Sequence, residues 1–261
     1  MNLKKLVKIS TVIIVAGLFS CGGGDPDSKY ILSFLIDDQV GIVSETEVLV
    51  VMPYGSDLTS LTPTITLPEG NTVSPESGVA QDFTNPVTYT VTAEDDSTKE
   101  YTVTAKVYEV GDTGPAGGVI FYGDADYGTY FEAATSDQAG TSAWSNINNA
   151  AIGLAAQGWS IGTGATNTIG ITDQVGHTNS AAKKCFDLSL GGKADWFLPS
   201  YQELVALYNN KAVIGGFADA IYWSSTENDA TEASGYDFLN GAGGSSTKNT
   251  ATFRVRCIRS F

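Results

Sequence analysis

Two runs of alternating residues constrain the fold of this chain more than any other feature of its sequence. Hydrophobic residues occupy every second position from Val87 to Val91 and from Tyr101 to Val107, with threonine or lysine between them. An acidic and polar segment, residues 94–98, separates the runs. Successive side chains of a strand point to opposite faces of a sheet. The pattern therefore predicts a β-hairpin with one buried face.

Further short strands are expected before this hairpin. Residues 47–52 and 61–67 are the candidates, and Pro63 suits an edge strand because proline has no N–H to give to a neighbour. Several short strands without helical periodicity favour a β-sandwich. We therefore expect one sandwich domain over residues 30–109.

Three sequence segments in this region resemble the small immunoglobulin-like domains that precede functional modules in many bacterial surface lipoproteins. They are Met52–Gly55, Leu58–Pro63 and Asn85–Asp95. The resemblance implies an immunoglobulin-like β-sandwich that acts as a spacer and could also bind a sugar or a partner. The acidic residues Glu94, Asp95 and Asp96 are expected to form a solvated turn, since the spacing of an EF-hand calcium loop is absent.

The N-terminus has the organisation of a signal peptide. Met1–Lys8 is basic, and Val12–Phe19 is apolar but too short to span a bilayer. Ser20 followed by Cys21 resembles a lipobox, although Phe19 stands where a small residue is usual, as in the looser lipoboxes of spirochaetes. We therefore expect residues 1–20 to be removed, Cys21 to be acylated and residues 21–29 to form a flexible tether. An ordinary secretory peptide that leaves Cys21 as a free thiol is the alternative.

The charge balance excludes one class of partner. The chain has 14 basic and 29 acidic residues, and loss of Lys4, Lys5 and Lys8 with the signal peptide would change its net charge from −15 to −18. Such a charge repels phosphate backbones, whose binding needs basic residues. We expect no nucleic-acid partner. The predicted acyl anchor places the protein in the cell envelope, on the outer membrane and exposed at the surface.

Two cysteines remain once Cys21 is acylated. Cys185 and Cys257 form an even pair in an exported chain, where disulfides persist. We expect them to be bonded to each other. Two reduced, buried thiols are the alternative, because the sequence gives no distance between them.

The second half of the chain, residues 110–261, shows a different pattern. The glycine-rich segment Gly111–Gly118 marks the boundary. Ser200 and Glu203 form the S-x-x-E pattern of a capping box and predict the start of a helix. Other helices are expected over 147–157 and 178–188, and strands at 119–122, 221–224, 235–239 and 252–258.

Four motifs in this half stand in the order of a known family. They are Asp195–Ser200, Glu203-Leu204, Tyr222–Glu227 and Phe253–Arg259. They resemble the C-terminal domain of the Legionella collagen-like adhesin and the related Fibrobacter major paralogous domain. The resemblance implies an α+β C-type-lectin-like architecture, related to the formylglycine-generating-enzyme fold. It also implies a role at the cell surface in adhesion and, in one branch, in binding sulfated polysaccharides.

Five residues are candidate ligand contacts in this second domain. Trp144, Trp159 and Tyr236 are aromatic residues in loops or strands, although packing in the core is the commoner fate of such residues. Arg254 and Arg256 would share one face of a strand. There they could pair with Glu227, Asp229 or Asp237, or could instead bind an anionic glycan through their guanidinium groups.

The residues for catalysis are missing. His177 is the only histidine, and it has no cysteine or G-x-S-x-G motif beside it. Clustered Cys and His ligands for zinc are absent, and Gly162, Gly164 and Gly170 do not form a phosphate-binding loop. We therefore expect no catalytic residue, metal or cofactor. A carbohydrate-active enzyme with two unrecognised carboxylates is a further alternative.

The sequence thus predicts a β-rich, two-domain surface lipoprotein that binds a glycan or a host or matrix protein through its lectin-like domain. A structural envelope protein without a small ligand is the alternative. Such a protein would assemble with itself, as a homo-trimer like the adhesin that it resembles.

Overall fold

The computed structural model describes residues 28–126 and 128–261. The predicted signal peptide, the acylation site at Cys21 and the tether up to residue 27 lie outside the described residues. Within them, no helix is both long enough and apolar enough to cross a membrane.

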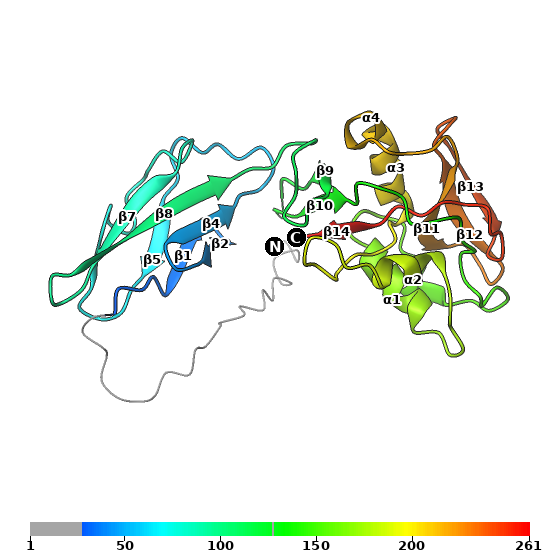
Figure 1. The fold of residues 1–261 in the computed structure, drawn as a ribbon, viewed down its shortest axis with the longest axis horizontal. Helices are drawn as coiled ribbons and strands as arrows, with labels where there is room; N and C mark the ends of the chain where they lie inside the picture. Colours follow the sequence, from blue (N-terminus) through cyan, green and yellow to red (C-terminus); the bar gives the residue numbers. More distant parts are fainter. Residues whose placement is uncertain (1–27, 127) are drawn as a thin grey trace, which may run out of the picture.

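The first part of the chain folds into two β-sheets that pack face to face (Figure 1). One sheet has the order β2-β1-β5 and the other the order β3-β4-β8-β7-β6, in which β4 and β8 are parallel. The strands are β1 (Ser33–Ile36), β2 (Gln39–Val40), β3 (Ile42–Val43), β4 (Glu47–Val51), β5 (Pro63–Thr66), β6 (Thr72–Ser74), β7 (Val87–Thr92) and β8 (Thr98–Lys106).

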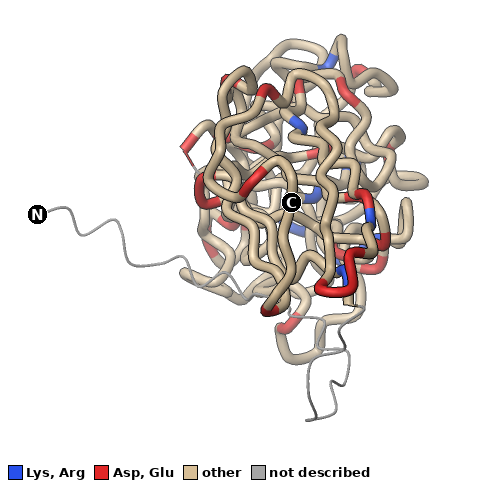
Figure 2. Tube along the Cα trace, turned by 90° about the vertical axis from the view of Figure 1, so that its left-hand side faces the viewer, with Lys and Arg blue, Asp and Glu red and all other residues tan. Residues whose placement is uncertain are grey.

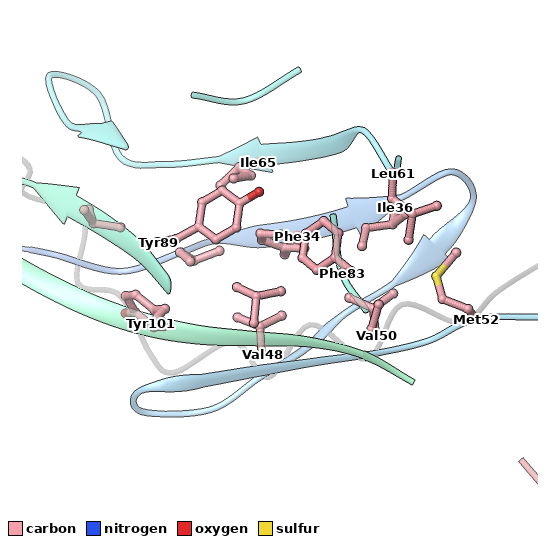
Figure 3. Close-up of a cluster of buried hydrophobic side chains, with 14 residues drawn as sticks. Phe34, Ile36, Val48, Val50, Met52, Leu61, Ile65, Phe83, Tyr89 and Tyr101 are labelled. Carbon is pink, nitrogen blue, oxygen red and sulfur yellow. The ribbon is translucent and has the colours of Figure 1, made fainter. Parts of the chain in front are cut away.

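The predicted hairpin is confirmed as β7 and β8, which pair antiparallel from Val87 opposite Val103 to Thr92 opposite Thr98. Pro63 begins β5, an edge strand, as its missing N–H requires. Tyr89 on β7 packs edge-on against Phe34 of the other sheet, with ring centroids 5.4 Å apart. Figure 3 shows how the inward side chains of both sheets fill one core.

The second part of the chain combines two small sheets with short helices (Figure 1). The sheets have the orders β14-β10-β9 and β11-β12-β13. The strands are β9 (Val119–Gly123), β10 (Tyr130–Ala133), β11 (Ile221–Glu227), β12 (Glu232–Asp237), β13 (Ala242–Thr247) and β14 (Ile258–Ser260). The helices are η2 (Gly153–Ala155), α1 (Gly164–Thr172), α2 (Ala181–Phe186), α3 (Tyr201–Asn209) and α4 (Lys211–Ile214).

The capping box is confirmed at the start of α3. The Ser200 hydroxyl accepts the N–H of Glu203, and the Glu203 carboxylate accepts the N–H of Ser200 at 2.7 Å. The helix expected over 147–157 is wrong, because only the single turn η2 forms there. Gly153 adopts a left-handed conformation with φ of +74°, which a continuous α-helix does not allow.

The predicted disulfide between Cys185 and Cys257 is present, with 5.2 Å between the two Cα atoms. It ties α2 to the segment that leads into β14, and both cysteines are fully buried. Trp144, Trp196 and Trp223 belong to the same hydrophobic cluster. The bond thus closes the core of the second part of the chain.

The two parts meet at Tyr130. Its hydroxyl donates to the carbonyl of Met52 at 2.9 Å and accepts the N–H of Tyr108 at 3.3 Å. The ring packs with Tyr108 and Phe261, and Val51 of the sandwich lies against the same cluster. This buried contact joins β4 to β10.

Candidate functional site

Two of the five predicted ligand contacts are buried. Trp144 has no exposed surface, and its indole N–H donates to the carbonyl of Ser224 at 2.8 Å. Arg256 is equally buried and donates to Asp137 at 2.8 Å and to the carbonyl of Gly216. The structure corrects the prediction for both, because neither side chain has surface with which to touch a ligand.

Arg254 is 39% exposed and pairs with the same acid, Asp137, at 3.4 Å. The internal pairing of Arg254 and Arg256 is therefore present, but the expected acids Glu227, Asp229 and Asp237 are not the partners. Asp137 lies more than a hundred residues away in the sequence and is brought to both arginines by the fold.

The structure brings Trp159 and Tyr236 together through Tyr201. The rings of Trp159 and Tyr201 are stacked, with centroids 4.0 Å apart and planes inclined by 25°. Tyr236 meets Tyr201 edge-on at 5.9 Å and Tyr208 at 5.2 Å. We call Trp159, Tyr201, Tyr208 and Tyr236 the aromatic platform. Trp159 is 45% exposed, and the three tyrosines are partly exposed.

A buried carboxylate holds the turn that follows Trp159. Glu203, fully buried on α3, accepts the N–H of Gly162 at 2.7 Å and that of Gly164 at 3.5 Å. Burial raises the pKa of Glu203, and the N–H groups that it accepts act in the opposite direction. A side chain on Gly164 would overlap this carboxylate, so the position requires glycine.

The backbone on both sides of Trp159 is fixed as well. The Asn167 side chain accepts the N–H of Gly158 at 3.0 Å and donates to its carbonyl at 2.6 Å. The Thr226 hydroxyl donates to the same carbonyl at 2.8 Å. The N–H of Gln202 donates to the carbonyl of Trp159 itself at 3.1 Å. The backbone that carries the indole is thus held on both sides.

The hairpin of β12 and β13 borders the platform. A side chain on Gly243 would overlap the hydroxyl of Tyr201, and one on Gly241 would overlap that of Tyr208. Glycine at both positions lets the strands pass directly beside the tyrosine rings. Behind the platform, a groove of about 220 Å³ runs along the sheet between Gly235, Gly244 and Phe253.

The platform has the chemistry of a binding surface. An exposed indole stacked on a phenol offers a flat apolar face, and the hydroxyls of Tyr201 and Tyr208 can donate and accept hydrogen bonds. The Tyr236 hydroxyl donates to the carbonyl of Gly241 at 2.9 Å and can still accept. One face of a sugar ring carries C–H bonds that pack on such a surface. Because the supporting loop is held by buried side chains, little conformational entropy is lost on binding.

The buried acids of this part of the chain serve the fold. Glu227 pairs with Lys248 at 2.6 Å and accepts the N–H groups of Ile152 and Gly153. Glu132 pairs with Arg259 at 2.6 Å. Across residues 28–126 and 128–261, no group of three or more His, Cys, Asp or Glu residues is placed to hold a metal ion.

Tyr201 and Tyr208 are not among the ligand contacts predicted from the sequence. Both lie on α3, seven residues apart, which places them on one face of a helix. Tyr201 is also the first residue of the helix, directly after the N-cap Ser200. This spacing was the signal that could have identified them.

Two families match the chain. The "SGBP, N-terminal" family matches residues 31–105, and the "Lcl C-terminal domain" family matches residues 128–259, just over half of the chain. No curated protein sequence matches.

Solved structures from three Bacteroides species resemble parts of the chain. A candidate glycoside hydrolase of Bacteroides thetaiotaomicron is 33% identical, over 35% of this chain and 30% of its own, with a TM-score of 0.32. A candidate secreted protein of Bacteroides fragilis is 19% identical, over 28% of this chain and 73% of its own, with a TM-score of 0.24. A fimbrial protein of Bacteroides ovatus is 11% identical, over 81% of this chain and 68% of its own, with a TM-score of 0.44. The chain spans less than a third of the first of these proteins, and TM-scores below 0.5 define neither fold nor function.

Proposed function

The chain belongs to the Lcl C-terminal domain family, and from this premise we propose that it binds a glycan at the bacterial cell surface through its aromatic platform. The family matched by residues 31–105 is that of the N-terminal part of surface glycan-binding proteins. Both matches are to families of bacterial surface proteins. The sandwich acts as the spacer, and the second domain is the binding head.

The stacked pair of Trp159 and Tyr201 carries this proposal. An indole that is 45% exposed is costly to leave in water, and here four buried or half-buried side chains hold its loop in place. Rigid aromatic surfaces of this kind bind ligands with little reorganisation. Binding without catalysis accounts for the platform, since its rings supply contact area and no reactive group.

Anchoring through Cys21 belongs to the same proposal. Its support is the sequence alone: a basic segment, a short apolar run and a serine directly before the cysteine. Intact mass measurement of the protein from membranes should give a chain that starts at Cys21 and carries acyl groups. A free thiol at that position, or a different first residue, would remove the anchor from the proposal.

The finer fold assignments remain part of the proposal too. They are an immunoglobulin-like topology for the sandwich and a C-type-lectin-like topology for the head, with domain limits at residues 30–109 and 110–261. The two-sheet core and the ordered motifs from Asp195 to Arg259 support them. An experimental structure that places the strands in a different order would overturn them.

Exchange of Trp159 for alanine tests the platform. We expect Trp159→Ala to reduce binding to a glycan array by at least about tenfold, because half of the stacked surface is lost. Phe186→Ala is the matched control, since Phe186 is 50% exposed on α2 and has no contact with the platform rings. Equal binding by both variants would refute the platform as the site.

Self-assembly is the second candidate function, and β13 favours it. This strand forms the outer edge of its sheet, is exposed along most of its length and carries no charged residue. Edges of this kind can pair with another chain. Light scattering that finds a monomer at all concentrations would exclude assembly, including the predicted homo-trimer.

A further inference from the structure

The fold uses its arginines internally. Arg254 and Arg256 share Asp137, at 3.4 and 2.8 Å. Arg259 lies between Glu132 and Asp195, at 2.6 and 2.8 Å. Arg256 and Arg259 are buried, so their guanidinium groups cannot also form the two parallel hydrogen bonds that recognise a sulfate or carboxylate. Arg254 is 39% exposed and makes one contact with Asp137. The arginines that the sequence suggested for an anionic glycan are therefore engaged.

Most of the lysines that the structure describes are engaged as well. Lys248 is buried against Glu227, while Lys106 and Lys183 pair with Asp112 and Asp187. Lys184 donates to two backbone carbonyls and Lys29 to the Ser97 hydroxyl. Acidic residues also outnumber basic ones. Figure 2 shows far more acidic than basic segments along the chain.

Among the residues that the structure describes, Lys211 is the one cation in contact with the platform rings. Its ammonium group lies 4.5 Å from the centre of the Tyr208 ring and donates to the carbonyl of Phe238. The strand that carries Tyr236 also carries two acids, Glu232 and Asp237, at its ends. Alternation along the strand turns Asp237 away from Tyr236, toward the groove behind the platform. A polyanion on the platform would therefore meet a single ammonium group, in a chain whose net charge is −15.

From this distribution of charge we infer that the ligand is an uncharged glycan, an inference that rests on the proposed function of the platform. Its sugar rings stack on Trp159 and Tyr201, and its hydroxyls exchange hydrogen bonds with the tyrosine hydroxyls at the edge. Sulfated and uronic-acid chains are disfavoured because, among the described residues, Lys211 alone offers a cation to the platform rings.

The test compares neutral polysaccharides with their own chemically sulfated derivatives. Calorimetry measures the affinity of each form for the purified protein. We expect the neutral form to bind at least about tenfold more tightly. Its affinity should change by less than about twofold between 50 and 500 mM NaCl, because no ion pair is screened. Lys211→Met should change this affinity by less than about twofold, whereas Trp159→Ala should weaken it by at least about tenfold.

Tighter binding of the sulfated form, weakened by salt and by Lys211→Met, would overturn the inference and leave the proposed binding function standing. Failure of both forms of every polysaccharide to bind would remove the proposed function and the inference together. Neutral binding that survives Trp159→Ala would refute the platform as the site.

Discussion

Three buried glutamates organise the loops of the second domain. Glu132, Glu203 and Glu227 each accept two or more backbone N–H groups from segments that contain glycine. Loops have no ladder of their own to satisfy these donors, and a carboxylate accepts several at once. Glu203 fixes the turn beside Trp159, and Glu132 fixes the turn before β9. The positions of the loops are thus set by single side chains in the core.

The hydroxyl of Tyr89 is buried in the sandwich without a hydrogen-bond partner among the described residues. Burial raises its pKa to about 12. Because an unsatisfied hydroxyl costs free energy, Tyr89→Phe should leave the free energy of unfolding unchanged or raise it by up to about 1 kcal/mol in urea denaturation.

Tyr101→Phe is the control, since the Tyr101 hydroxyl donates to the carbonyl of Lys29 at 2.9 Å. Its loss should lower the free energy of unfolding by about 1 kcal/mol. Destabilisation of the same size by Tyr89→Phe would reveal a partner for that hydroxyl.

Acid should weaken the ion pair at Asp195. Hydrogen bonds from Arg259 hold the pKa of Asp195 below its usual value of 3.8. A lowered pKa means that the pair contributes to stability above pH 3.8, and that the contribution is lost as pH falls through the lowered value. Melting temperatures between pH 2 and 6 should therefore fall less steeply for Asp195→Asn than for the wild type. Parallel curves for the two proteins would contradict this.

The sequence identified only part of the platform. Trp159 and Tyr236 were candidates because they are large aromatic residues near loops, but so was Trp144, which is buried. The sequence does not show which loops pack over the core, and therefore which of these aromatic side chains are buried. Tyr201 stacks on Trp159, 42 residues earlier in the sequence, and Asp137 pairs with Arg254, 117 residues later. Contacts between residues so far apart are set by the tertiary fold.

At the scale of elements, periodic segments were predicted better than irregular ones. The hairpin of β7 and β8 follows directly from alternating residues, and α3 follows from its capping box. Helix α1 was missed because its sequence, from Gly164 to Thr172, contains two glycines and three threonines, which disfavour a helix. Tertiary contacts override that preference, since Asn167, Thr168 and Ile171 are buried against the core.

Loss of the disulfide should destabilise the second domain strongly. The Cys185–Cys257 bond spans 72 residues, and closing a loop of that length contributes about 4 kcal/mol in the chain-entropy model. We expect the double variant Cys185→Ala, Cys257→Ala to lose about that much in guanidinium denaturation. Denaturation of the wild type with and without a reductant is the control, and a change below about 1 kcal/mol would show that the bond adds little.

At the scale of the whole molecule, Tyr130 joins sandwich and head. It places two hydrogen bonds and a buried ring between them, together with Tyr108 and Phe261. Close approaches of Tyr54 to Gly123 and of Pro53 to Gly128 add to this contact. The head is therefore held in a fixed direction relative to the sandwich.

Tyr130→Ala should uncouple the two parts. We expect its thermogram to separate into two transitions and its small-angle scattering to show a broader distribution of distances, because the contact that orients the head is gone. Tyr30→Ala, at a position 51% exposed on the sandwich, should keep the wild-type behaviour. A single unchanged transition in Tyr130→Ala would mean that the parts unfold together for another reason.

The two ends of the sandwich bear on how the protein withstands force. Lys29 lies against the turn between β7 and β8, where it contacts Ser97 and Tyr101, whereas the chain leaves at Lys106, the far end of β8. Nine residues of strand separate entry and exit by about 30 Å. Traction applied between the N-terminus and the head therefore runs along the strands. The hydrogen bonds between strands lie across that direction, so they carry the load in shear, many at once, instead of opening one after another.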